Sequence, residues 1–302
     1  MLIVAGKGGV GKTTVTAALA RMAADAGLTA LIVEVEGKSG LAAAFGHDDT
    51  VLDYNEIELS PGVRARTLTP DRALVEYLQD HGLKRLSKRL SSSGVLDVVA
   101  TAAPGIKDIL VLGKVKQLER AGAADVIIVD APAAGHAVTF LASARGLIDA
   151  VRVGPILTQA EEVVALLNDA ARCQVILVTL PEETPVNEVV ETAFALEDRV
   201  GVQLGPVVVN GLYPVRDLDL DATSGATSPA EEETLRAAGE FRLHRQGLQR
   251  EQLERLATAL PLPRLELPLL FTTELGAEEV GLLAAALAEQ VQALPEPETV
   301  ST

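Results

Sequence analysis

The sequence predicts an α/β fold, a doubly wound and mostly parallel sheet with an inserted helical layer, and three observations support this prediction. Short runs such as residues 2–4 and 126–129 are apolar throughout, which is typical of strands covered by helices on both faces. These runs alternate with segments whose apolar residues recur at helical spacing. A glycine-rich turn, residues 6–11, joins the first run to the first such helix. Strands and helices that alternate in this way build a parallel sheet.

In the first half of the chain, each predicted element follows from a local pattern. Residues 2–4 are the first strand, and a helix with apolar positions at Leu19 and Met22 follows until Gly27 stops it. The run 29–36 is a second strand that closes on two glutamates spaced to lie on one face. The remaining elements are a short helix at 41–45, an irregular stretch at 48–62, a strand at 64–68, a helix at 70–80 and an interrupted helical stretch at 83–122.

The second half of the chain continues the alternation. Residues 125–130 are a strand that closes on Asp130, and residues 206–210 are a strand that closes on Asn210. Residues 217–233 are acidic and rich in Ser and Thr, which predicts a mobile loop. The other expected strands are 174–180 and 264–267, and the expected helices are 137–147, 159–171, 185–200, 230–260 and 276–294.

Length and composition limit the possible architectures and functions. The 302 residues alone suggest about two domains. The pattern instead favours one domain over residues 1–294, with a helical insertion at about 70–122, a charged helical segment at about 230–260 and a polar tail at 295–302. The net charge of −16 would repel a phosphate backbone, so we expect no binding of nucleic acid.

The single cysteine, Cys173, allows no internal disulfide and no Cys-x-x-Cys metal site, and we expect a buried, inert thiol in a reducing compartment. No uncharged apolar run approaches the ~18 residues of a membrane-spanning helix. The first strand begins at position 1 and leaves no room for a signal peptide. These features predict a cytoplasmic location without direct membrane insertion.

Residues 6–13, Gly-Lys-Gly-Gly-Val-Gly-Lys-Thr, fit the pattern G-x-x-x-x-G-K-[ST], with the strand before it and the helix after it that a P-loop requires. Glycines let the backbone wrap closely around a phosphate and turn N–H groups toward it. Lys12 is then expected to bridge the β- and γ-phosphates of ATP, Thr13 to ligate Mg²⁺ and Thr14 to contact the α-phosphate. The predicted nucleotide-binding residues of this loop are Gly6, Lys7, Gly8, Gly9, Val10, Gly11, Lys12, Thr13 and Thr14.

Asp130 follows four apolar residues at the end of a predicted strand. This is the Walker B arrangement, in which the carboxylate holds a water on Mg²⁺. The sequence therefore predicts a metal site made by Thr13 directly and by Asp130 through water.

Four segments resemble the ArsA family of anion-pump-type ATPases, which includes the eukaryotic targeting factor for tail-anchored membrane proteins. Lys7 gives the loop the form K-G-G-x-G-K-[ST], which is similar to the deviant Walker A loop of the ParA, MinD, nitrogenase iron protein and ArsA superfamily. Residues 34–46 occupy the place of switch I, and residues 130–136 resemble the switch II pattern D-T-A-P-T-G-H. Residues 207–210 resemble the strand whose Asn reads adenine. The likeness is closest to the short bacterial branch of the family.

The resemblance implies a dimeric ATPase in which Lys7 crosses the interface to the nucleotide of a second subunit. It further implies that Lys12, Lys7, Glu36 and Asp130 act in hydrolysis and that Asn210 and Pro268 contact the nucleotide. Glu36 stands where the family usually has a water-orienting aspartate. Glutamate is one methylene longer than aspartate, and a displacement of about 1 Å can cost ~10²-fold in rate. This departure therefore predicts hydrolysis that is slow or that needs a partner.

Other interpretations stay open at this point. The departures at switch I also fit a weakly catalytic nucleotide switch, half of a heterodimer with a second ArsA-like ATPase. A positioning ATPase of MinD or ParA type is a further alternative, although residues 276–294 contain no Lys or Arg with which to bind an anionic membrane. A homodimer, a heterodimer and an unidentified protein or anion client are all compatible with the sequence.

Overall fold

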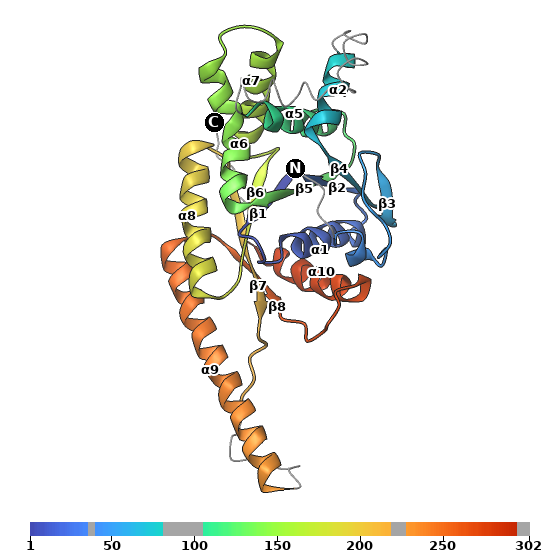
Figure 1. Ribbon diagram of the computed structural model, residues 1–302. Helices are drawn as coiled ribbons and strands as arrows, with labels where there is room; N and C mark the ends of the chain where they lie inside the picture. The colour runs from blue at the N-terminus through green and yellow to red at the C-terminus, as the bar shows by residue number, and fades with distance from the viewer. Residues whose placement is uncertain (36–39, 81–104, 219–227, 295–302) are drawn as a thin grey trace.

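The computed structural model describes residues 1–35, 40–80, 105–218 and 228–294, and over these ranges it confirms the predicted fold class. One sheet in the order β3-β4-β2-β5-β1-β6-β7-β8 forms the centre of the molecule (Figure 1). Neighbouring strands run parallel except β3 and β4. The strands are β1 (Leu2–Gly6), β2 (Ala30–Val35), β3 (Ile57–Ser60), β4 (Val63–Leu68), β5 (Val126–Ala133), β6 (Gln174–Thr179), β7 (Leu204–Leu212) and β8 (Arg264–Pro268).

The apolar strands are explained by helices on both sides of the sheet. On β1, Ile3 belongs to one buried cluster and Val4 to the other, because successive side chains of a strand point to opposite faces. On one face lie α1 (Lys12–Asp25), the short 3-10 helix η1 (Ala43–Phe45) and α10 (Ala277–Val291). On the other face lie α5 (Ile106–Arg120), α6 (Ala134–Ala150), α7 (Pro155–Leu167) and α8 (Glu183–Arg199).

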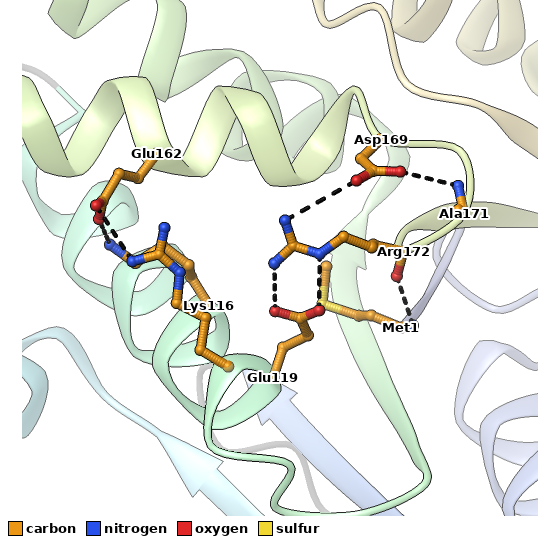
Figure 2. A network of polar contacts seen from close by, with 8 residues as sticks. Met1, Lys116, Glu119, Glu162, Asp169, Ala171 and Arg172 are labelled. Atoms are coloured by element: carbon orange, nitrogen blue, oxygen red, sulfur yellow. Dashed lines mark hydrogen bonds and ion pairs between the residues drawn. The ribbon is translucent and has the colours of Figure 1, made fainter. Parts of the chain in front are cut away.

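The helical insertion between β4 and β5 is described in two parts, α2 (Pro70–Asp80) and α5. The predicted helical residues from 83 to 104 lie outside the described residues, and the proposed domain boundaries stay a prediction. Figure 2 shows how α5 is tied to its neighbours. The Lys116 ammonium of α5 pairs with Glu162 of α7, and Glu119 accepts two hydrogen bonds from Arg172, at 3.0 and 2.6 Å. The amino group of Met1 donates to the Arg172 carbonyl oxygen at 2.7 Å.

The 31-residue helix α9 (Pro229–Ala259) projects from the body of the molecule (Figure 1). Only its C-terminal part joins the core, where Leu256 is fully buried. The predicted mobile loop at 217–233 overlaps the predicted helix at 230–260, and the structure confirms the helix, so the loop prediction is wrong for 229–233. Ser228 caps the helix by accepting a hydrogen bond from the Glu231 N–H at 3.3 Å, and Pro229 has a fixed φ that suits the first helical turn.

Several predicted boundaries are corrected by the structure. Residues 57–60 were expected to be irregular, but they pair antiparallel with β4. The turn between these strands is Pro61-Gly62, and Gly62 takes a φ of 80°, which a type II turn requires. β5 continues past Asp130 to Ala133, so that aspartate does not end its strand. Pro155 starts α7 four residues earlier than predicted, since proline fits the first turn of a helix.

The structure contains no helix, within its described ranges, that is long and apolar enough to cross a membrane. The C-terminal helix α10 uses its apolar side inside the protein. Val280, Leu283 and Leu287 are buried against the cluster that includes α1. This burial weighs against the alternative in which α10 binds a membrane.

Candidate functional site

The turn between β1 and α1 depends on glycines, because a side chain at these positions would disrupt the turn. Gly9 and Gly11 have φ values of 85° and 89°, in the left-handed region that favours glycine. A Cβ on Gly6 would lie 2.3 Å from the Val178 carbonyl oxygen of β6, and a Cβ on Gly11 would lie 2.2 Å from Nδ2 of Asn210. The backbone therefore approaches its neighbours more closely than any other residue would allow.

The first turn of α1 carries the residues that were predicted to bind phosphate and metal. Lys12 is 8% exposed, and its Nζ donates to the Lys7 carbonyl oxygen at 2.9 Å, so its ammonium lies at the loop. Thr13 and Thr14 follow it and are both half-buried. Gly11 is the N-cap and has no side-chain oxygen to offer the first N–H groups of α1. Such a helix N-terminus suits an anion.

Asp130 lies on β5 between two parallel neighbours, opposite Val4 of β1 and Glu34 of β2. Its side chain is fully buried, and Oδ2 accepts a hydrogen bond from Oγ1 of Thr13 at 2.8 Å. The hydroxyl and the carboxylate thus meet although they come from different elements. Hard oxygen donors of this kind fit Mg²⁺, which takes one or two protein ligands and completes its shell with water and phosphate.

Glu34 is fully buried, and its Oε2 accepts a hydrogen bond from Oγ1 of Thr67 on β4 at 2.8 Å. It is therefore not a solvated charge at the end of its strand. Glu36, which was expected to orient the attacking water, lies outside the described residues.

Asn210 and Pro268 come from neighbouring strands at the same edge of the sheet. Asn210 Nδ2 donates to the Val10 carbonyl oxygen at 3.0 Å, so its amide braces the glycine loop. Pro268 ends β8, opposite Leu212 of β7, and lines a hollow of about 310 Å³ with residues of α9. Of the two, Asn210 directly contacts the loop.

Lys7 is paired with a carboxylate that the sequence did not point to. Its Nζ lies 2.8 Å from Oε1 of Glu188 on α8, at the edge of a hollow of about 400 Å³. Gly8 and residues of α6 and α8 line this hollow. Sequence reasoning missed Glu188, because no local pattern marks a helical glutamate as the partner of a distant loop lysine.

The remaining candidate ligands and the single thiol lie as follows. Among the residues that the structure describes, no three His, Cys, Asp or Glu side chains gather in a way that could hold a metal ion. Cys173 is 1% exposed, and burial raises the pKa of its thiol to about 12. The thiol therefore stays protonated at neutral pH, as the inert interpretation expects.

A central parallel strand, a glycine loop, a helix and a buried carboxylate on the adjacent strand together define a P-loop NTPase fold. Residues 1–153 match the family described as anion-transporting ATPase. The chain is 33% identical over 249 residues to ATPase BagA of Mycobacterium tuberculosis, covering 78% of this chain and 72% of that protein. The chain therefore belongs to the anion-transporting ATPase family.

Two relatives of lower identity also have names that include ATPase. The chain is 28% identical over 171 residues to ATPase get3 of Schizosaccharomyces japonicus, covering 52% of this chain and 50% of that protein. It is 27% identical over 221 residues to the arsenical pump-driving ATPase of Escherichia coli, covering 72% of this chain and only 35% of that protein. These names support an ATPase activity at the level of the family.

Proposed function

We propose that this chain binds MgATP on the loop from Gly6 to Thr14 and hydrolyses it to ADP and phosphate. The observation that carries the proposal is the meeting of Thr13 and Asp130. A buried carboxylate accepts the Thr13 hydroxyl hydrogen bond at 2.8 Å, and the ammonium of the adjacent Lys12 donates to the Lys7 carbonyl oxygen of the loop. Family membership supports the same activity.

Each predicted site residue then has a definite task. Backbone N–H groups of the loop and of the first turn of α1 bind the phosphates, and Lys12 neutralises charge that develops on the γ-phosphate. Thr13 and Asp130 would hold Mg²⁺, the latter through water. An ion held by these residues would neutralise negative charge on the phosphates. Glu36 would accept a proton or hydrogen bond from the attacking water, and Asn210 and Pro268 would contact the adenine.

We further propose that two subunits cooperate, with Lys7 of each subunit directed to the nucleotide of the other. The support is the K-G-G-x-G-K-[ST] form of the loop and the half-exposed position of Lys7 on the surface. Loss of the γ-phosphate would then change how the subunits dock through residues 36–46 and 130–136. A heterodimer with a second ArsA-like ATPase is the alternative that the altered switch I favours.

The test is phosphate release from MgATP by the full chain. Lys12→Ala is expected to lower turnover by about 10²–10³-fold, the usual cost of removing one preorganised charge or donor from such a site. Thr13→Val is expected to lose activity and Thr13→Ser to retain most of it, since only the hydroxyl is needed.

Arg21→Gln is a matched control for Lys12→Ala. It removes one positive charge from the same helix at a partly exposed position, where Arg21 pairs with Asp25. Its turnover should equal that of the wild type. A Lys12→Ala protein that hydrolyses MgATP as fast as the control would contradict the proposal. Turnover that appears only after a second ArsA-like chain is added would favour the heterodimer.

A further inference from the structure

Lys7 is paired with a carboxylate of its own chain, which conflicts with its proposed task. Its Nζ lies 2.8 Å from Oε1 of Glu188, and the two side chains are 41% and 35% exposed. The ion pair holds the ammonium at α8 of its own subunit. A movement of Lys7 toward a phosphate on another subunit would compete with this contact.

We propose that Glu188 is a positioning residue that stores Lys7 inside its own subunit, so that nucleotide-dependent pairing of two subunits must first break the Lys7–Glu188 ion pair. This inference rests on the proposed function, because it assumes that Lys7 acts on the nucleotide of a second subunit. It adds a residue on α8 to the control of that step.

Glu188 is well placed to stay behind when Lys7 leaves. The helix that carries it is fixed to the sheet by Val186 and Val189, which are 2% and 3% exposed. The Glu188 carbonyl oxygen also accepts a hydrogen bond from Oγ1 of Thr192 at 2.6 Å. Lys7 lies instead on a loop and has a flexible four-carbon stem. We therefore expect Lys7, and not Glu188, to move when the ion pair breaks.

The surroundings of Glu188 oppose the departure of Lys7. Its second oxygen, Oε2, is buried and receives no hydrogen bond from the described residues. The other charged side chains lining the same hollow are Glu191 and Arg199. Lys7 is the cation that directly contacts this carboxylate, and its departure removes that contact from a partly enclosed charge.

The expected effect is modest because both side chains are partly exposed. An ion pair of this exposure changes an equilibrium by about two- to five-fold. A symmetric dimer would break two such pairs, so the dissociation constant of the dimer should change by about the square, roughly four- to twenty-five-fold.

The experiment measures self-association of the full chain by sedimentation, with the magnesium complex of a non-hydrolysable ATP analogue. Glu188→Gln keeps the size and polarity of the side chain but removes its charge. It should lower the dissociation constant of the dimer by the factor above. Glu191→Gln removes one charge from the same hollow, one helical turn further on, and should leave the dissociation constant unchanged.

A double-mutant cycle separates storage of Lys7 from a merely structural role of Glu188. Added to Lys7→Ala, Glu188→Gln should have no effect, because the stored group is gone. The inference is overturned if Glu188→Gln leaves association unchanged or weaker, if no dimer forms with either protein, or if the gain persists without Lys7. Hydrolysis that survives Lys12→Ala would instead overturn the proposed function, whatever the dimer does.

Discussion

Single residues decide the shape of the loop, and Gly6 is the clearest case. Its missing side chain leaves room for the Val178 carbonyl oxygen, which a Cβ would approach to 2.3 Å. That oxygen belongs to a buried backbone and cannot move away cheaply. The contact ties the end of β1 to β6, directly before the residues proposed to bind phosphate.

We therefore predict that Gly6→Ala lowers the free energy of unfolding by about 1–3 kcal/mol, the usual cost of overpacking. Chemical denaturation followed by circular dichroism measures this change. Gly8→Ala is the control, since a Cβ at this exposed glycine would meet no atom within 4 Å. Equal stability of the two variants would show that the close approach to β6 has no energetic consequence.

The sequence could predict the residues of the site that depend on local geometry. Lys12 and Thr13 begin a helix after a glycine loop, and Asp130 lies in an apolar strand, so their meeting follows from the motif. Burial of Glu34 and the contact of Lys7 with Glu188 depend on how distant elements pack. No spacing along the chain encodes such contacts.

At the scale of elements, the sequence failed to predict a strand that is short and has no clear apolar pattern. β3 has only four residues, of which one is buried, and its best marker was the Pro61-Gly62 turn rather than any apolar pattern. The helix predicted at 230–260 is confirmed as α9, and Ser228 and Pro229 together form the capping signal at its start. Strands with apolar runs, such as β2 and β5, were predicted in the right place, although the end of β5 was not.

One pair of charges links two elements and should affect stability at low pH. Two hydrogen bonds from Arg172, before β6, hold the pKa of Glu119 on α5 below its usual range. A carboxyl group with a lowered folded pKa stabilises the protein above its unfolded pKa, near 4.3, and loses this contribution as the pH falls. Arg172 is 37% exposed, which screens the pair and limits its contribution to about 1 kcal/mol.

We predict that Glu119→Gln lowers the free energy of unfolding at pH 7 by about this amount and has little effect near pH 3. Denaturation curves between these two pH values measure the difference. Glu161→Gln on α7 is a control at an exposed position. A difference between Glu119→Gln and wild type that stays constant with pH would contradict the assignment of the pKa shift to this pair.

At the scale of the whole molecule, the sheet order builds the site. β1 lies between β5 and β6, so the loop after β1 meets Asp130 on one side and Val178 on the other. The alternation of strands and helices predicts a parallel sheet but not this order. The order follows from how the connections cross over the sheet, which short-range patterns do not specify.

The central claim is that each catalytic site draws Lys7 from a second subunit, and a mixing experiment tests it most directly. Lys7→Ala and Asp130→Asn are each expected to abolish most turnover of MgATP when assayed alone. In a mixed dimer, the Lys7→Ala subunit keeps its own Lys12 and Asp130 and receives Lys7 from the Asp130→Asn subunit. One complete site is then formed.

The measurement is phosphate release from an equimolar mixture of the two variants after exchange of subunits. Random pairing gives mixed dimers in half of the population with one active site each, so we predict about a quarter of the wild-type rate. A mixture no more active than the separate variants would contradict the claim that Lys7 acts across the interface.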